Sequence, residues 1–388
     1  MSTFSENIII FGGGRWTRVI IKVLSDIIKN DCYIYIHTNN CNDLMKDWII
    51  NENLSHKVFL IKNLNTIFSK NIKTAIISNS PKDHFKRATW ALKKNLNVLI
   101  EKPLCINEKE FVYLKKISIT SKGKLCAAHV FNYLSSLNTY KNLIPDINKI
   151  SKINITWIDP VVEKRYGEIK NTIPKISIYL DVLPHIFSII KTIWSTSPKT
   201  LSKVKLTKGS SLLCFETRIK GTKTKIKIER LGKERKRVIE AFSEEDSFKL
   251  DFTNEPGFFK SKENTIVMEK YGEKNIRPLT QLLNSFLRYS KENIWDERLS
   301  TNLVLPFLKF SEKLDKYHTR NINNLFNMIK NKDYILSKND FYLINEFLQK
   351  SNDIDIKEVN KIIENLIEYL RNNDYTQIEI DSIDLLNL

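Results

Sequence analysis

Three consecutive glycines directly after a short apolar strand constrain this chain more than any other feature. The expected strand Asn7–Phe11 runs into Gly12, Gly13 and Gly14 before a helical pattern begins. The chain has 388 residues but only 10 glycines, so this concentration needs a backbone reason, since glycine permits tight turns and close approach to a ligand. The pattern Gly12-x-Gly14-x-x-Thr17 between a strand and a helix is typical of a turn that receives a dinucleotide pyrophosphate. Thr17 stands where the third glycine is usual.

The first third of the chain alternates strands with helices. Strands are expected at Asn7–Phe11, Cys32–His37, Lys57–Ile61, Thr74–Ser78, Val98–Ile100 and Leu125–Val130. Helices are expected between them at Trp16–Lys29, Asn42–Asn51, Asp83–Lys94 and Glu108–Ser121. This repetition predicts an α/β fold, a doubly wound parallel sheet of Rossmann type over residues 1–131.

The pattern changes between residues 132 and 330, where strands follow one another directly. Strands are expected at Ile153–Trp157, Ser202–Thr207, Leu212–Ile219, Lys223–Arg230, Lys236–Ala241 and Thr265–Glu269. Helices are expected at Lys175–Trp194, Pro278–Lys291 and Leu299–Lys316. We expect an α+β domain with an open, mostly antiparallel sheet covered on one face.

An acidic extension over residues 331–388 follows. It holds 6 Lys/Arg and 12 Asp/Glu. Because it contributes −6 to a net charge of +18, residues 1–330 carry +24. Amphipathic helices are expected at Phe341–Lys350 and Ile356–Asn372. A stabilising helical hairpin is the favoured interpretation, and docking on the basic body or on a partner is the alternative.

Composition excludes several classes of protein. The basic residues are spread along the body without a base-stacking motif, which argues against nucleic acid as a partner. We expect a cytoplasmic protein, because no apolar run is long enough to span a membrane and no secretory leader is present. The cysteines have no metal-ligand spacing, so we expect a reduced protein without a metal; they are Cys32, Cys41, Cys105, Cys126 and Cys214.

The end of the second expected strand bears on the choice between NAD and NADP. A carboxylate there binds the ribose 2′-hydroxyl of NAD, whereas its absence leaves room for a 2′-phosphate. The strand ends at His37, followed by Thr38, Asn39 and Asn40, with no carboxylate before Asp43. Neutral donors at this place favour NADP(H) over NAD(H), with Thr38 and Asn39 as the expected contacts.

Two further segments resemble the Gfo/Idh/MocA family of oxidoreductases. The first is Ala75–Pro81 with His84 after it, and the second is Val98–Leu104, which contains Glu101-Lys102-Pro103. The resemblance covers roughly residues 5–320. It implies a Rossmann domain joined to a second α/β domain, nicotinamide-dependent redox chemistry, and homodimers or homotetramers formed through the open sheet.

The same resemblance implies the roles of individual residues. Lys102 is implied to be catalytic beside the nicotinamide, with Glu101 holding it and Pro103 in a cis peptide bond. On spacing alone, Glu101 and Lys102 would be an ordinary surface ion pair. The implied cofactor contacts are Gly12, Gly14, Arg15, Trp16, Thr38, Asn39, Ser78, Asn79, His84, Glu101, Lys102 and Pro103.

A second family mark is Asp181 with His185, which share one helical face at i, i+4. By resemblance, Asp181 binds or positions substrate and His185 exchanges a proton with the reacting oxygen, a task that suits imidazole. A lone histidine among apolar residues is usually part of the core, and the pairing with Asp181 favours the functional interpretation. His129 and Tyr133, after the last Rossmann strand, are the remaining candidates for substrate contact, with ordinary strand-end polar residues as the alternative.

Two departures from sugar-oxidising members direct the choice of substrate. Ser188 stands where many of them carry a further aspartate, and Pro184 precedes His185 where glycine and a small residue are usual. Both bring the chain closer to thiazolinyl imine reductases, whose substrate is tethered to an acidic carrier protein that the +24 body would attract. A sugar or polyol dehydrogenase and a non-catalytic dinucleotide-binding scaffold are the alternatives.

Overall fold

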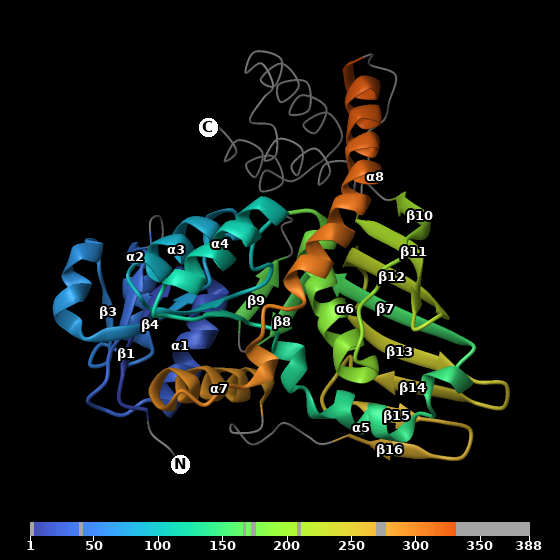
Figure 1. Cartoon of the computed structure of the whole chain (residues 1–388), viewed down its shortest axis with the longest axis horizontal. Coiled ribbons are helices and arrows are strands. Elements are labelled where there is room, and N and C mark those ends of the chain that lie inside the picture. The colour runs from blue at the N-terminus through green and yellow to red at the C-terminus, as the bar shows by residue number, and fades with distance from the viewer. Residues whose placement is uncertain are drawn as a thin grey trace.

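The computed structural model describes residues 4–38, 42–165, 168–171, 176–207, 211–268 and 277–330. Asn39, the two helices expected after residue 340 and the whole extension from residue 331 lie outside this description. Figure 1 shows two layered units side by side, a smaller sheet between helices and a larger sheet backed by helices.

The amino-terminal unit is a six-stranded sheet in the order β3-β2-β1-β4-β5-β6, and every pairing in it is parallel. This confirms the doubly wound sheet. The strands are β1 Asn7–Phe11, β2 Ile34–His37, β3 Val58–Leu60, β4 Ile72–Ile77, β5 Asn97–Ile100 and β6 Leu125–Ala127. All six lie within the segments expected from the pattern or within two residues of them.

The middle strands of the sheet are buried on both faces because their central residues are apolar. Ile8 and Ile10 pack into one core cluster and Ile9 and Phe11 into another, since successive strand residues point to opposite faces. The helices between the strands are α1 Arg15–Ile27, α2 Asn42–Asn51, α3 Pro81–Lys93 and α4 Glu108–Thr120, with a 3-10 turn, η1, at Leu64–Lys70.

One late helix, α7 (Pro278–Glu292), returns to this unit rather than staying with the second sheet (Figure 1). Its apolar side packs beside α1 and β4, with Leu282 and Phe286 in the core cluster that holds Ile8 and Ile10. The stretch that forms α7 therefore packs with the first unit.

The second unit contains an eight-stranded sheet in the order β10-β11-β12-β7-β13-β14-β15-β16. Only β7 and β12 pair in parallel, and the other neighbours are antiparallel, as expected. The strands are β7 Lys152–Pro160, β10 Ser202–Thr207, β11 Leu212–Ile219, β12 Thr222–Gly232, β13 Lys236–Phe242, β14 Ser247–Asp251, β15 Phe258–Lys260 and β16 Thr265–Val267.

The pattern did not predict four strands. β14 and β15 are short and border turn residues such as Pro256 and Gly257, so neither gives a clear alternation of its own. A two-stranded hairpin of β8 Val162–Arg165 and β9 Glu168–Asn171 lies between the expected strand Ile153–Trp157 and the expected helix Lys175–Trp194, where no strand was predicted.

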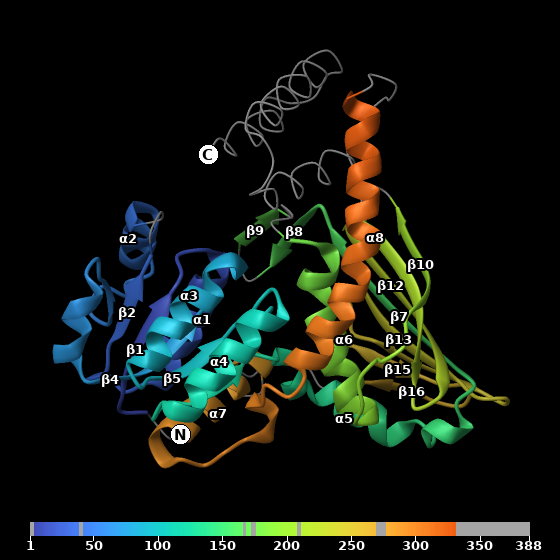
Figure 2. The same cartoon turned by 45° about the horizontal axis from the view of Figure 1, so that its top comes forward.

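Helices cover one face of the large sheet, as Figure 2 shows. The central one is α6 (Ile178–Trp194), which is buried along most of its length, and α8 (Val304–Lys330) packs on it. α8 is longer than expected because no glycine or proline interrupts residues 317–330. Smaller pieces complete the unit: η2 Val130–Tyr133, α5 Ser135–Leu143, η3 Ile147–Lys149 and η5 Glu297–Leu299.

Candidate active site

The glycine turn has the geometry that its sequence predicts. Gly12 has φ +149°, and a Cβ there would lie 2.5 Å from Thr17 Oγ1 and 2.8 Å from Ser78 Oγ. Thr17 fills the place of the usual third glycine: its hydroxyl lies 3.0 Å from that of Ser78 and so ties α1 to the end of β4. The side chain of Ser78, an expected cofactor contact, is thus engaged with the turn itself.

The start of α1 presents an open anion site. Gly14 is the N-cap and has no side chain, so no side-chain cap occupies the first turn, and a Cβ at Gly14 would meet nothing within 4 Å. The unpaired N–H groups of a helix start attract negative charge. Arg15 is the first residue of this helix, which places a cation at the same end.

The end of β2 brings together two nitrogen-bearing side chains. His37 lies beside Phe11, with ring centroids 5.7 Å apart, and the Arg87 guanidinium of α3 lies 5.5 Å from the centre of the same Phe11 ring. Burial first and Arg87 second hold the pKa of His37 below its ordinary value. Its Nδ1 is buried with no hydrogen-bond partner among the described residues. Thr38, an expected cofactor contact, follows at the strand end. The sequence pattern did not single out His37 or Arg87.

The His84 side chain, an expected cofactor contact, is buried between two backbone turns. The side chain is 1 % exposed, and its ring nitrogens lie 2.8 Å from the Pro103 carbonyl oxygen and 3.1 Å from the Asn79 carbonyl oxygen. It joins the turn after β4 to the turn after β5. Burial lowers its pKa. Asn79 keeps its expected place at the strand end, and its Oδ1 is buried without a partner within the described part of the chain.

Glu101 does not hold the Lys102 ammonium, contrary to the resemblance. Its carboxylate accepts from the backbone N–H of Lys102, at 3.3 Å, and from the indole N–H of Trp16. Burial raises the pKa of the Glu101 carboxyl despite these bonds. Glu101 therefore connects the strand end to the first turn of α1. The Lys102–Pro103 peptide bond is cis, as expected.

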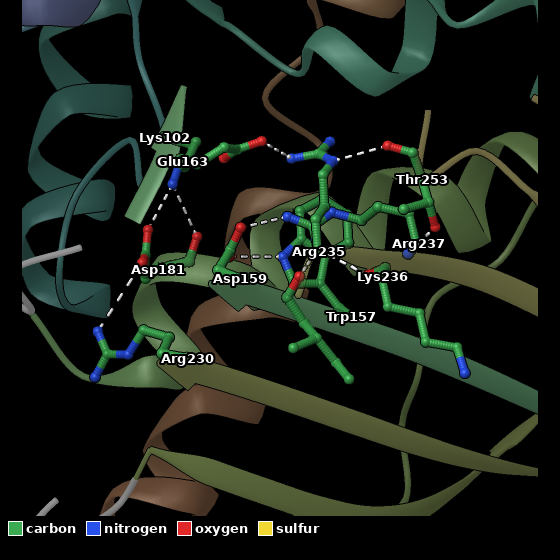
Figure 3. Close-up of polar contacts among 11 residues, drawn as sticks. Lys102, Trp157, Asp159, Glu163, Asp181, Arg230, Arg235, Lys236, Arg237 and Thr253 are labelled. Carbon is green, nitrogen blue, oxygen red and sulfur yellow. Dashed lines mark hydrogen bonds and ion pairs between the residues drawn. The ribbon is translucent and has the colours of Figure 1, made fainter. Parts of the chain in front are cut away.

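Lys102 instead reaches across to the second unit. Its Nζ lies 2.6 Å from Asp181 Oδ1 and 3.0 Å from the Asp181 carbonyl oxygen, on the first turn of α6. Arg230, at the end of β12, lies 3.9 Å from Asp181 Oδ2. Figure 3 shows the three side chains converging, with the carboxylate between the two cations. Burial raises the pKa of Asp181, but Lys102 and Arg230 outweigh it, so the pKa lies below its ordinary value.

His185 lies one turn after Asp181, against aromatic rings. Its imidazole is stacked on Trp157 with centroids 5.2 Å apart and planes at 17°, and it meets the Phe131 ring at 4.9 Å. Burial first, followed by Lys102 and Arg237, holds the pKa of His185 well below its ordinary value of 6.5. The ring is therefore neutral at pH 7. Pro184 precedes it inside α6, where proline cannot donate to the Leu180 carbonyl.

The structure separates the last two candidates, His129 and Tyr133. The Tyr133 hydroxyl lies 3.4 Å from Asp296 Oδ2, and Arg298 covers its ring at 4.1 Å, so the Tyr133 side chain is held by the segment after α7. His129 is 8 % exposed and contributes to the field at His185. Its Nε2 has no hydrogen-bond partner among the residues described, and burial lowers its pKa to about 4.

The sequence did not identify the residues that form the far wall of this site. Trp157 and Asp159 come from β7, and Arg237 comes from β13 directly opposite Trp157. The Trp157 side chain is buried, at 4 % exposure. One signal was present: Asp159 and Arg237 break apolar patterns at strand positions where a charge requires a partner.

The residues present fit a nicotinamide dinucleotide. The open helix start at Gly14 suits a pyrophosphate, and the orphaned Asn79 Oδ1 lies at the carboxyl end of β4, where ligands bind in such sheets. Lys102 follows the adjacent strand β5. No cluster of three or more metal-ligating side chains occurs within the described ranges, and none of the described helices is long and apolar enough to cross a membrane.

Comparisons with known proteins support the architecture. No family model and no curated protein matches the chain. A dehydrogenase from Clostridium difficile superimposes with a TM-score of 0.66 at 12% identity, over 81% of this chain and 99% of that one. A UDP-N-acetylglucosamine 3-dehydrogenase from Acidithiobacillus ferrooxidans gives 0.62 at 13% identity, over 80% and 97%.

A third structure is KijD10, a 3-ketoreductase from Actinomadura kijaniata in complex with TDP-benzene and NADP. It gives a TM-score of 0.61 at 9% identity, covering 78% of this chain and 94% of that one. At these identities the likeness shows the fold, which is the two-unit architecture that the Gfo/Idh/MocA resemblance implies.

Proposed function

We propose that this chain is an NADP(H)-dependent oxidoreductase that reduces a C=O or C=N bond, with Lys102 and His185 handling the proton. The observation that carries the proposal is the position of Lys102. It follows a strand of the dinucleotide-type sheet, and its ammonium group reaches Asp181 of the second unit at 2.6 Å. A charged proton donor thus lies at the junction of the two units, where the reacting atoms would meet.

The division of labour between the two basic groups follows from their surroundings. Bound NADPH would supply the hydride. In reduction, the Lys102 ammonium donates the proton to the developing oxyanion or nitrogen anion, because the neutral His185 has no second proton to give. In the reverse oxidation the same path runs backwards: the hydroxyl proton returns to the Lys102 amine, and the neutral His185 imidazole accepts a hydrogen bond from that hydroxyl. Asp181 orients the lysine.

The electrostatics of the wall favour negative charge on the substrate. Three cations, Lys102, Arg230 and Arg237, face two carboxylates, Asp181 and Asp159. Fixed cations at such a wall stabilise an oxyanion that develops during hydride transfer and need no reorganisation when it does.

NADP(H) rather than NAD(H) is proposed from the end of β2. No carboxylate follows that strand before Asp43, and the Arg87 guanidinium lies near His37 across the Phe11 ring. A 2′-phosphate would meet a cation there, whereas a ribose hydroxyl would find no acidic partner. KijD10, which has this fold, is in complex with NADP.

A sugar or nucleotide-sugar dehydrogenase is the second candidate. The neutral His185 suits acceptance of a hydroxyl proton, and the solved structures that share this fold include a UDP-N-acetylglucosamine 3-dehydrogenase and a myo-inositol 2-dehydrogenase. Reduction of a carrier-tethered imine is supported by Ser188, which stands in place of an aspartate. In the structure the Ser188 hydroxyl donates to the His185 carbonyl at 2.8 Å and is buried.

Partners and compartment are proposed on the same basis. The outer face of the eight-stranded sheet is the proposed surface for a homodimer or homotetramer, and an acidic carrier protein is the proposed macromolecular partner of the basic body. The described cysteines Cys32, Cys105, Cys126 and Cys214 are unpaired, which suits a reducing cytoplasm.

The proposed function is tested first by cofactor binding and then by hydride transfer. NADPH fluorescence should report a complex, and turnover should be sought in both directions, with NADPH against keto-sugars and cyclic imines and with NADP+ against polyols and sugar nucleotides. Absence of NADPH and NADH binding would remove the proposal. Binding without turnover of any compound by any route, including single-turnover mixing, would favour the non-catalytic scaffold.

A further inference from the structure

The wall behind His185 is built around a pair of residues that face each other across two strands. Trp157 of β7 and Arg237 of β13 are directly opposed in the antiparallel ladder. Both side chains point to the covered face of the sheet and are buried, with Arg237 only 2 % exposed. A charged side chain at such a position requires a partner and, in most proteins, a reason.

The partner is Asp159, which binds both members of the pair. Its Oδ2 accepts from the indole N–H of Trp157 at 3.0 Å, and its Oδ1 forms an ion pair with the Arg237 guanidinium (Figure 3). Arg237 also donates to the backbone carbonyls of Ile158 and Lys236. The carboxylate therefore fixes the ring and the cation together.

The Trp157 ring contacts charge and imidazole at once. The guanidinium carbon of Arg237 lies 3.6 Å from the ring centroid, a close cation–π contact. The His185 imidazole is stacked on the same ring at 5.2 Å, while Phe131 presents its edge to the imidazole at 4.9 Å. Rings on two sides leave the imidazole little freedom to turn about its own axis.

Charges from every element around His185 act on its protonation. Lys102 from the first unit, Arg237 from β13 and His129 before η2 oppose a second proton, and Asp159 of β7 favours one. Burial acts in the same direction as the cations. The sum disfavours the imidazolium.

We propose that Trp157, Asp159 and Arg237 are positioning residues for His185, with Arg237 acting through the tryptophan ring to fix the imidazole and disfavour its second proton. The role in catalysis rests on the proposed function, but the arrangement itself does not. It gives a role to a buried arginine that is held beside a carboxylate, and it assigns the hydrogen-bond roles: Lys102 donates and His185 accepts.

The test follows the six histidines in the cofactor-free protein by NMR, with ¹³C-labelled imidazoles. The His185 signal is assigned from His185→Asn. In the wild type it should not titrate between pH 6 and 8. In Arg237→Gln its midpoint should rise by about one pH unit or more, whereas Arg237→Lys, which keeps the charge, should stay near the wild type.

Arg235→Gln is the matched control. Arg235 lies two residues away, pairs with Glu163 at 3.2 Å and donates to the Thr253 carbonyl (Figure 3). This variant should leave the His185 signal unchanged. An Arg237→Gln titration that superimposes on the wild type would overturn the proposal.

If Arg237→Gln does not fold, Trp157→Phe provides a second test of the His185 titration midpoint. This variant keeps an aromatic ring. It removes the indole bond to Asp159, so the His185 midpoint should again rise, and an unchanged midpoint would count against the proposal. NADPH binding to the wild type is measured separately. Its loss would remove the proposed function, while the titration would still decide the role of Arg237.

Discussion

The two sides of the candidate site are built on different principles. The amino-terminal side is made of strand ends and a helix start, and it offers backbone N–H groups, an orphaned amide oxygen and open space. The opposite side is made of side chains packed on a sheet and offers buried charges that neutralise one another in pairs. The first side suits a dinucleotide cofactor, and the second suits a smaller substrate. Lys102 belongs to the first side by chain position and to the second by its bond to Asp181.

The largest expected effect comes from breaking that connection. Lys102→Met removes the proton donor and should lower turnover by about 10³-fold, since positioned general acids contribute on the order of 10²–10⁴. NADPH affinity should change little, because the pyrophosphate contacts lie in the glycine turn. Lys86→Met, at an exposed position on α3, is the control. Equal losses in both variants would show that Lys102 has no special role.

A second prediction concerns stability on the substrate side. His129 binds a proton with a pKa of 6.5 when unfolded but only of about 4 when folded. The unfolded chain therefore binds more protons between these values, and the free energy of unfolding falls as pH decreases through that window. The loss attributable to His129 is about 2 kcal/mol between pH 7 and pH 4.5.

This loss is measured by urea unfolding at pH 7 and pH 4.5. His129→Phe should reduce the difference between the two pH values, and His56→Gln, at an exposed position, should leave it as in the wild type. A difference that is the same in all three proteins would show that His129 is not titrating in a buried site.

A smaller effect is expected on the cofactor side, in the preference for NADPH over NADH. Arg87→Gln should reduce the preference for NADPH over NADH by about tenfold, the equivalent of 1.4 kcal/mol, because the 2′-phosphate loses a cation near His37. Affinity for NADH should remain. Dissociation constants for both nucleotides check this prediction, with Lys86→Gln on the same helix as the control. Equal loss for both nucleotides would place Arg87 outside the 2′-phosphate site.

The smallest effect is expected at Tyr133. Because its hydroxyl bonds to Asp296 rather than facing the site, Tyr133→Phe should change turnover by less than about twofold and cost about 1 kcal/mol of stability. Steady-state rates and thermal unfolding check both numbers. A large loss of turnover with stability unchanged would return Tyr133 to the substrate site.

The two sides of the candidate site also differ in how far the sequence predicts them. Local patterns are predictable, whereas contacts between distant segments are not. The glycine turn, the cis Lys102–Pro103 step and the Asp181–His185 pair are local patterns, and the structure has each of them in place. The partners of Glu101, His84 and Tyr133 are set by contacts between segments, so no local pattern predicts them. The pairing of β7 with β13 brings together Trp157, Asp159 and Arg237. Neither segment alone predicts the register of that pairing.

The second sheet shows the same limit. Its long strands were predicted because alternation is clear over seven or more residues, as in β11 and β12. The three-residue strand β15 and the hairpin of β8 and β9 were missed, since their pairing depends on neighbours rather than on their own pattern. Glu163 of β8 forms an ion pair with Arg235, which directly precedes β13. The local sequence pattern of neither segment predicts this ion pair.

The most direct measurement is a crystal structure of the wild-type protein with NADPH. We predict that the pyrophosphate lies over Gly12 and Gly14 at the start of α1, with the nicotinamide ring in contact with the Lys102 side chain. A nucleotide bound elsewhere, or a complex in which Lys102 keeps away from the ring, would contradict it.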